Sequence, residues 1–124
     1  MIAVHEYSIF ESAVSLQENG RVDMITVLAS IHVRTGRLAD FLHIFKDNMV
    51  EVRKEKGCIE YFPAIDIPVD LPSQVVDENV VTVLEKWDTM EALKAHLVSS
   101  HMQAYRVMVK DMIENVQLKI LKEA

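Results

Sequence analysis

Cysteine is nearly absent from the chain, and this scarcity excludes two kinds of site. Cys58 is the single cysteine among 124 residues, so no disulfide can form within the chain and no thiolate cluster can bind a metal. Such a chain fits a reducing compartment. The first 20 residues also place Glu6 and Glu11 where a secretion signal needs an unbroken apolar core. We therefore expect a cytoplasmic protein.

Long apolar runs and clusters of basic residues are missing as well. No stretch approaches the ~20 apolar residues that a membrane-spanning helix requires. The 13 Lys and Arg residues are outnumbered by 19 Asp and Glu residues, which gives a net charge of −6. They are also scattered, whereas binding to phosphates needs them clustered. We therefore expect neither a membrane nor a nucleic acid as a partner. The length suits one domain with one core.

Proline and glycine are scarce, with three of each, and their positions divide the chain. All three prolines lie between residues 63 and 72. Because proline disrupts helices and central strands, residues 63–78 are predicted to form a long loop, of the kind that often serves as a lid over a site. Gly57 is predicted to end a long helix that begins near Thr35, since glycine readily adopts the left-handed conformation that ends helices.

Apolar residues in the remaining segments either alternate or recur at helical spacing. These patterns predict strands at 24–33, 58–62, 80–87 and 116–121, and helices at 35–56, 89–97 and 100–112. Asp88 with Glu91, and Ser100 with Gln103, have the spacing of capping boxes, which breaks the last helical region in two. The order β-α-β-β-α-β predicts a ferredoxin-like α+β fold with an antiparallel sheet. Residues 24–124 form this domain, and residues 1–23 are predicted to be an N-terminal arm with a short helix or strand.

Three short motifs occur in a characteristic order in this domain. They are Gly57-Cys58, Glu85-x-Trp87 and Glu91-Ala92-Leu93-x-x-His96. With the first strand and the long helix, they resemble the antibiotic biosynthesis monooxygenase family over about residues 24 to 120. The resemblance implies a dimeric α+β barrel. It also implies a family that includes quinol and phenol oxygenases working without metal or flavin, haem-degrading enzymes, and an isomerase of a phosphorylated sugar.

The resemblance favours a cofactor-independent monooxygenase that acts with dioxygen on a phenolic or quinol-like small molecule. Such chemistry needs a base to form an electron-rich phenolate and an apolar cavity that excludes water. His96 is the candidate base, because histidine exchanges protons near neutral pH, and Glu85 is the candidate that orients it. The candidates for substrate binding are Trp87, Phe45, His32, Tyr61 and Tyr105.

The histidines are not predicted to bind a metal. His96 and His101 are five residues apart, which is not the spacing of a helical ligand pair, and the predicted helix break at Ser99-Ser100 separates them further. His101 is predicted to be an exposed residue of a first helical turn. We therefore expect no cofactor.

Two other functions stay open at this stage. An isomerase of a small phosphorylated sugar would need a basic phosphate site, for which Arg34, Arg37 and Arg106 are the candidates. A non-catalytic dimeric module that binds a small ligand is favoured by Val83, because some oxygenating relatives carry an Asn four residues before the Trp. A filled pocket would favour the module, and a cavity beside Trp87 would favour an enzyme.

Overall fold

A computed structural model describes residues 24–124, and the predicted arm at residues 1–23 lies outside the described residues. The elements are β1 (Ile25–Val33), α2 (Leu38–Val52), β2 (Cys58–Ile65), β3 (Val80–Trp87), α3 (Met90–Leu97), α4 (Ser100–Val109), a short 3-10 turn (Lys110–Met112) and β4 (Ile113–Leu121). The order β-α-β-β-α-α-β confirms the predicted ferredoxin-like fold, including the break in the second helical region.

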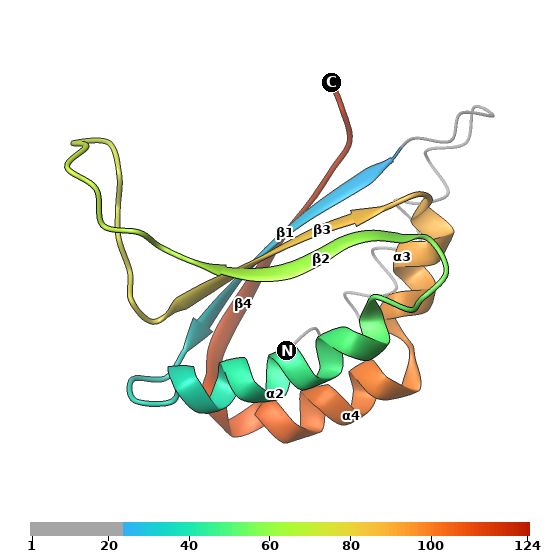
Figure 1. The fold of residues 1–124 in the computed structure, drawn as a ribbon, viewed down its shortest axis with the longest axis horizontal. Coiled ribbons are helices and arrows are strands. Elements are labelled where there is room, and N and C mark those ends of the chain that lie inside the picture. The colour runs from blue at the N-terminus through green and yellow to red at the C-terminus, as the bar shows by residue number, and fades with distance from the viewer. Residues whose placement is uncertain (1–23) are drawn as a thin grey trace.

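The four strands form one antiparallel sheet in the order β2-β3-β1-β4. Figure 1 shows α2 and α4 side by side along one face of this sheet, with α3 near one end. The register aligns Tyr61, Glu85, Val27 and Ile120 in one row across all four strands. Since Tyr61, Glu85 and Val27 are buried, this row lies on the face that the helices cover.

Alternation in β1 separates a buried face from a partly exposed one, as the sequence predicts. Every second residue from Ile25 to Val33 is buried, and the helices contribute Phe41, Phe45 and Leu93 to the same core. Burying a side chain of this size stabilises a fold by roughly 1.5 to 3 kcal/mol. On the opposite face, Leu28 and His32 are only half-buried.

The end of α3 at Leu97 and the start of α4 at Ser100 agree with the prediction, and the other helix ends differ from it by one to four residues. Helix α3 is capped by Thr89 rather than Asp88, because the Thr89 hydroxyl accepts a hydrogen bond from the backbone N–H of Ala92 at 3.1 Å. Helix α4 is likewise capped by Ser99 rather than Ser100. Helix α2 begins at Leu38 without a side-chain cap and ends at Val52, before the predicted end.

The predicted loop at residues 63–78 was wrong at its start, because β2 continues through Pro63 to Ile65. Strand β2 lies at the edge of the sheet and pairs with β3 alone. Proline is tolerated there, since an edge strand does not need every backbone N–H for pairing. The connection to β3 extends beyond the sheet at the end opposite α3 (Figure 1). Within residues 24–124, no helix combines the length and apolar character needed to cross a membrane.

Candidate active site

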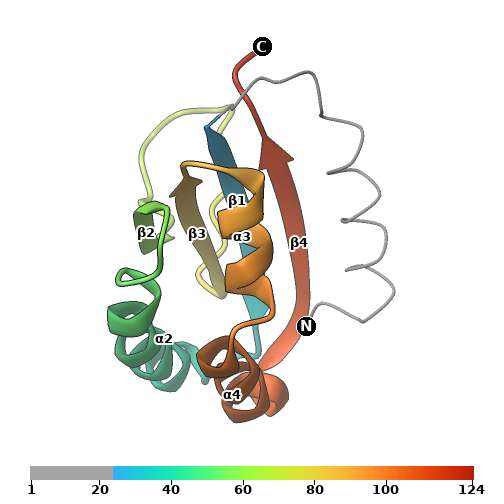
Figure 2. The same cartoon turned by 90° about the vertical axis from the view of Figure 1, so that its right-hand side faces the viewer.

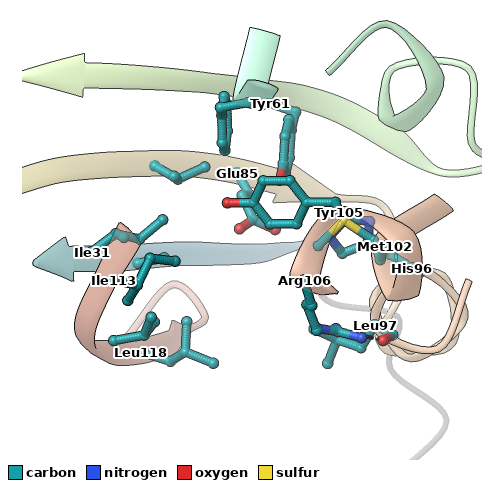
Figure 3. Close-up of a pocket in the computed structure, with 14 residues that line it drawn as sticks. Ile31, Tyr61, Glu85, His96, Leu97, Met102, Tyr105, Arg106, Ile113 and Leu118 are labelled. Atoms are coloured by element: carbon teal, nitrogen blue, oxygen red, sulfur yellow. Dashed lines mark hydrogen bonds between the residues drawn. The ribbon is translucent and has the colours of Figure 1, made fainter. Parts of the chain in front are cut away.

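A cavity of about 70 Å³ lies between the helix-covered face of the sheet and helices α2, α3 and α4 (Figure 3). This volume has room for roughly five water molecules. Its walls are mostly apolar. The lining residues are Ala29, Ile31, Phe45, Tyr61, Val83, Glu85, His96, Leu97, Met102, Tyr105, Arg106, Ile113, Val116 and Leu118. Five of the seven predicted site residues, Phe45, Tyr61, Glu85, His96 and Tyr105, therefore meet at one cavity.

His96 is held on several sides of its imidazole ring. Its Nδ1 atom lies 2.8 Å from Oε2 of Glu55, and its ring centroid lies 4.7 Å from that of Trp87 and 5.4 Å from that of Tyr61. The residue is 1% exposed. Because Glu55 engages Nδ1, Nε2 is the ring nitrogen available to a molecule in the cavity.

Glu55 is the residue that the sequence reasoning missed. It follows the end of α2, and its Oε2 atom also lies 2.9 Å from Nε2 of His101. Burial acts to raise the pKa of Glu55, but the hydrogen bonds from His96 and His101 outweigh it and lower the pKa below its usual value. Glu55 therefore stays a carboxylate that accepts from Nδ1 of His96 and, in one of the two tautomers of His101, from Nε2 of that residue. Its position two residues before the Gly57-Cys58 motif was the available signal.

The prediction that the helix break separates His96 from His101 was wrong. The break between α3 and α4 turns both imidazoles toward the same carboxylate oxygen of Glu55. Ser99, at the break, caps α4 and has its hydroxyl 3.3 Å from Nε2 of His101. His101 is half-buried rather than exposed, so the break brings the two histidines together in space.

Glu85 contacts the indole of Trp87 rather than orienting the imidazole. Its Oε1 atom accepts a hydrogen bond from Nε1 of Trp87 at 3.0 Å. Burial raises the pKa of Glu85, and the nearby His96 and the indole hydrogen bond offset this only in part. A buried carboxyl on the cavity wall is suited to hold a hydroxyl or carbonyl of a ligand. Glu55, by contrast, orients His96 directly.

The aromatic candidates form a packed wall around the cavity. Phe45 and Tyr61 stack with a centroid distance of 5.4 Å and an angle of 4°, and Tyr105 meets Phe45 edge to face at 6.1 Å. Burial raises the pKa of both Tyr61 and Tyr105. The two phenols therefore remain neutral at physiological pH and are suited to donate hydrogen bonds to a ligand.

Two predicted site residues do not line the cavity. Trp87 is fully buried behind His96 and supports its ring. His32 pairs with Val80 and Asn115 and alternates with the cavity residue Ile31, so it lies on the opposite face of the sheet. No residue of the predicted lid at 63–78 is part of this lining, and the nearest lining residue along the chain is Tyr61 in β2.

The three arginines nominated for a phosphate site are not gathered at the cavity. Arg37 pairs with Asp40 on the surface, with 3.5 Å between Nε and Oδ2, and Arg34 is exposed in the turn before α2. Arg106 does line the cavity, where its guanidinium donates a hydrogen bond to the backbone oxygen of Leu97 at 2.6 Å. Of the three candidate arginines, Arg106 lies at the cavity wall and the other two do not, so they do not form a basic cluster there.

Within residues 24–124, one group of side chains could bind a metal ion. Ligand atoms of Glu55, His96 and His101 all lie within 4.8 Å of one another, and two imidazoles with a carboxylate are donors that zinc and non-haem iron accept. The sequence argument against a metal site considered only spacing along the chain, and it did not predict this set, because Glu55 lies 41 positions before His96. The same atoms already satisfy one another by hydrogen bonds at 2.8 and 2.9 Å.

The ferredoxin-like sheet carries an apolar cavity, and His96 lies at this cavity between Trp87 and Glu55. The chain belongs to the antibiotic biosynthesis monooxygenase family, whose sequence profile matches residues 24–107. This confirms the family resemblance.

Individual proteins resemble the chain in sequence or in fold. The chain is 32% identical over 101 residues to the Escherichia coli K12 protein named "Probable quinol monooxygenase YgiN", a match that covers 80% of this chain and 97% of YgiN. A crystal structure of a conserved Methanosarcina mazei protein superposes with a TM-score of 0.72 at 21% identity, covering 83% of this chain and 95% of that one. A Caulobacter crescentus protein described by the same family name has a TM-score of 0.71 at 25% identity, with 83% and 92% covered.

Proposed function

We propose that the protein is a cofactor-independent monooxygenase that oxidises a phenolic or quinol-like small molecule with dioxygen. The observation that carries this proposal is the placement of His96, whose Nδ1 is engaged by Glu55 while its ring borders an apolar cavity. Membership of the family and the similarity to a protein named as a quinol monooxygenase support the same reaction class.

The first step is removal of a hydroxyl proton from the substrate by Nε2 of His96. The resulting phenolate is electron-rich enough to pass an electron to dioxygen. Glu55 favours this step because its carboxylate stabilises the imidazolium that forms, as a buried charged hydrogen bond does. The Trp87 and Tyr61 rings hold the imidazole in place while it exchanges the proton.

The oxygenation is balanced without an added reductant. After electron transfer, one oxygen atom of dioxygen bonds to a ring carbon and forms a hydroperoxide. Loss of the ring hydrogen and cleavage of the O–O bond then leave a new carbonyl, and the second oxygen atom departs as water. The quinol supplies all four electrons, so quinol and dioxygen give a hydroxyquinone and water. The apolar walls limit the water that reaches these intermediates.

Substrate size and orientation follow from the cavity walls. A space of about 70 Å³ is well below the ~300 to 1,000 Å³ of most ligand pockets, so it disfavours polycyclic substrates, and a single-ring quinol requires the wall side chains to move apart. Phe45 and Tyr61 offer flat faces to that ring, and the carboxyl of Glu85 offers a partner for a second hydroxyl or a carbonyl. The presence of both His96 and Glu85 on the wall favours a quinol, which carries two oxygen atoms on one ring.

A homodimer is part of the proposal. The sheet face away from the helices carries a row of Leu28, Leu84 and Phe62, aligned by the strand register. On the other face, Leu118 and Ile120 of β4 are more than a third exposed, and Figure 2 shows β4 at the sheet edge beyond α3. Apolar rows of this kind need cover that the described helices do not supply. Light scattering of the purified protein is expected to give twice the mass of one chain.

Isotope incorporation tests the proposed reaction. The full-length protein is incubated with ¹⁸O₂ and a panel of single-ring quinols, and the products are analysed by mass spectrometry. One ¹⁸O atom is expected in the hydroxyquinone, with formation abolished in His96→Ala and unchanged in His43→Ala, an exposed histidine of α2. Binding of panel members without any turnover would instead favour the non-catalytic module. Product without ¹⁸O would exclude an oxygenase.

A further inference from the structure

Glu55 and His101 do not line the cavity, yet they connect its histidine to the molecular surface. Oε2 of Glu55 lies 2.8 Å from Nδ1 of His96 and 2.9 Å from Nε2 of His101. The exposure of the three side chains rises in that order, from 2% for His96 through 14% for Glu55 to 26% for His101. One oxygen atom thus joins a buried imidazole to one that solvent reaches.

We propose that Glu55 and His101 form a proton relay between His96 and solvent, a role that rests on the function proposed above. A base sealed in an apolar site must exchange its proton with water before and after each turnover. The cavity wall is poorly suited to this exchange, because it is mainly apolar and is occupied by substrate during the reaction. The three hydrogen-bonded side chains offer a path on the other side of the ring.

Each step of the outward transfer moves one proton and leaves the electron count unchanged. The substrate hydroxyl gives its proton to Nε2 of His96, and the proton on Nδ1 passes to Oε2 of Glu55. The same oxygen then passes a proton to Nε2 of His101, which accepts it in the tautomer that carries its own proton on Nδ1, and Nδ1 releases that proton to water. Glu55 is suited to the middle position because its two hydrogen bonds share one oxygen atom.

The return transfer completes the cycle. When the O–O bond breaks, the departing oxygen needs a proton, and Nε2 of His96 holds one. Nδ1 is refilled from water through His101 and Glu55 in the same step, so His96 stays neutral. Both imidazoles recover their starting tautomers, which a one-way path would not achieve. The ring of His96 stays in place throughout, in agreement with its close packing against Trp87.

Dependence on added buffer distinguishes a relay from a structural role. In His101→Ala the kcat for the quinol is expected to fall by roughly tenfold or more at low buffer concentration, with KM little changed. Added imidazole is expected to restore kcat in this variant and to leave the wild-type kcat unchanged. His43→Ala, which removes an exposed histidine paired with Asp47, is the matched control. A wild-type kcat in His101→Ala, or a loss that imidazole does not restore, would overturn the relay.

A chelator separates the relay from a metal centre built on the same atoms. Wild-type kcat is expected to survive exhaustive dialysis against EDTA. Loss of activity that Zn²⁺ or Fe²⁺ restores would overturn the relay and assign Glu55, His96 and His101 as metal ligands.

NMR of the ring protons tests the connection without relying on turnover. A slowly exchanging Nδ1–H resonance of His96 is expected in the wild type and is expected to be lost in Glu55→Gln. If this resonance is present but no quinol is consumed, the proposed function fails while the hydrogen-bonded chain stands. If the quinol is consumed but the resonance is missing, the relay fails and the proposed function stands.

Discussion

Nδ1 of His96 lies 2.8 Å from Oε2 of Glu55, although 41 positions of the chain separate the two residues. This hydrogen bond selects the nitrogen of His96 that meets the cavity. It also places a charged group behind an imidazole whose other faces are covered by Trp87 and Tyr61. The active-site proposal depends on this pair, so the first prediction concerns its contribution to stability.

Replacing Glu55 by Gln is expected to destabilise the protein in a pH-dependent way. The folded state lowers the pKa of Glu55, so the carboxylate contributes stability above the pKa of the unfolded chain, near ~4.3, and loses it as the pH falls through the folded pKa. The loss in the free energy of unfolding is expected to be roughly 1–3 kcal/mol at pH 7 and smaller at pH 3. Urea unfolding at a series of pH values measures it.

Glu51→Gln is the control for this experiment, because Glu51 lies in α2 and pairs with Lys54 on the exposed surface. Its effect is expected to stay within about 0.5 kcal/mol at every pH. A Glu55→Gln loss that does not shrink in acid would contradict the assignment of Glu55 as the stabilising carboxylate.

Replacing Glu85 by Gln is expected to have the opposite pH dependence. The folded state raises the pKa of Glu85, so the carboxyl favours folding below the pKa of the unfolded chain, and this contribution is lost as the pH rises through the folded pKa. The stability of Glu85→Gln relative to the wild type is therefore expected to improve between pH 4 and pH 7, as thermal unfolding will show. A constant difference across this range would mean that burial does not shift the titration of Glu85.

Gly57 is expected to tolerate alanine far less than Gly36 does. The φ value is 86° at Gly57 and 84° at Gly36, and a residue with a side chain adopts such positive values only at a cost in stability. A Cβ atom at Gly57 would also collide with Oδ1 of Asp88 and lie 2.6 Å from Cβ of Ala92, whereas at Gly36 nothing lies within 4 Å. Gly36→Ala is expected to cost about 1 kcal/mol, and Gly57→Ala at least about 1 kcal/mol more, in urea unfolding. Equal losses would place the cost in the backbone alone.

Local patterns were sufficient to predict the elements, because they depend on neighbours in the chain. Alternation in the strand at 80–87 puts Glu85 and Trp87 on one face, and that face is the buried one. Pro63 was assigned to a loop because sequence does not show that β2 is an edge strand. The caps were displaced by one residue since Thr89 and Ser99 offer the same hydroxyl chemistry next to the predicted positions.

The centre of the site could be predicted only in part. His96 was found through its motif, but its partner Glu55 lies 41 residues away and meets it only when α2 packs beside α4. The spacing of His96 and His101 argued against their convergence, yet the turn at Ser99 directs both toward Glu55. His32 was misplaced because a polar position on a strand indicates a face, and the sequence did not show which face borders the cavity.

The central claim is that His96 removes a proton from a phenolic hydroxyl in the cavity. Anaerobic binding of a quinol, followed by ultraviolet difference spectroscopy, tests this directly, because the phenolate absorbs at longer wavelength than the phenol and no oxidation intervenes. The phenolate band is expected on binding to the wild type and to His43→Ala, and its absence is expected in His96→Ala that still binds the quinol. A phenolate band of equal size in His96→Ala would contradict the account, since another group would then be the base.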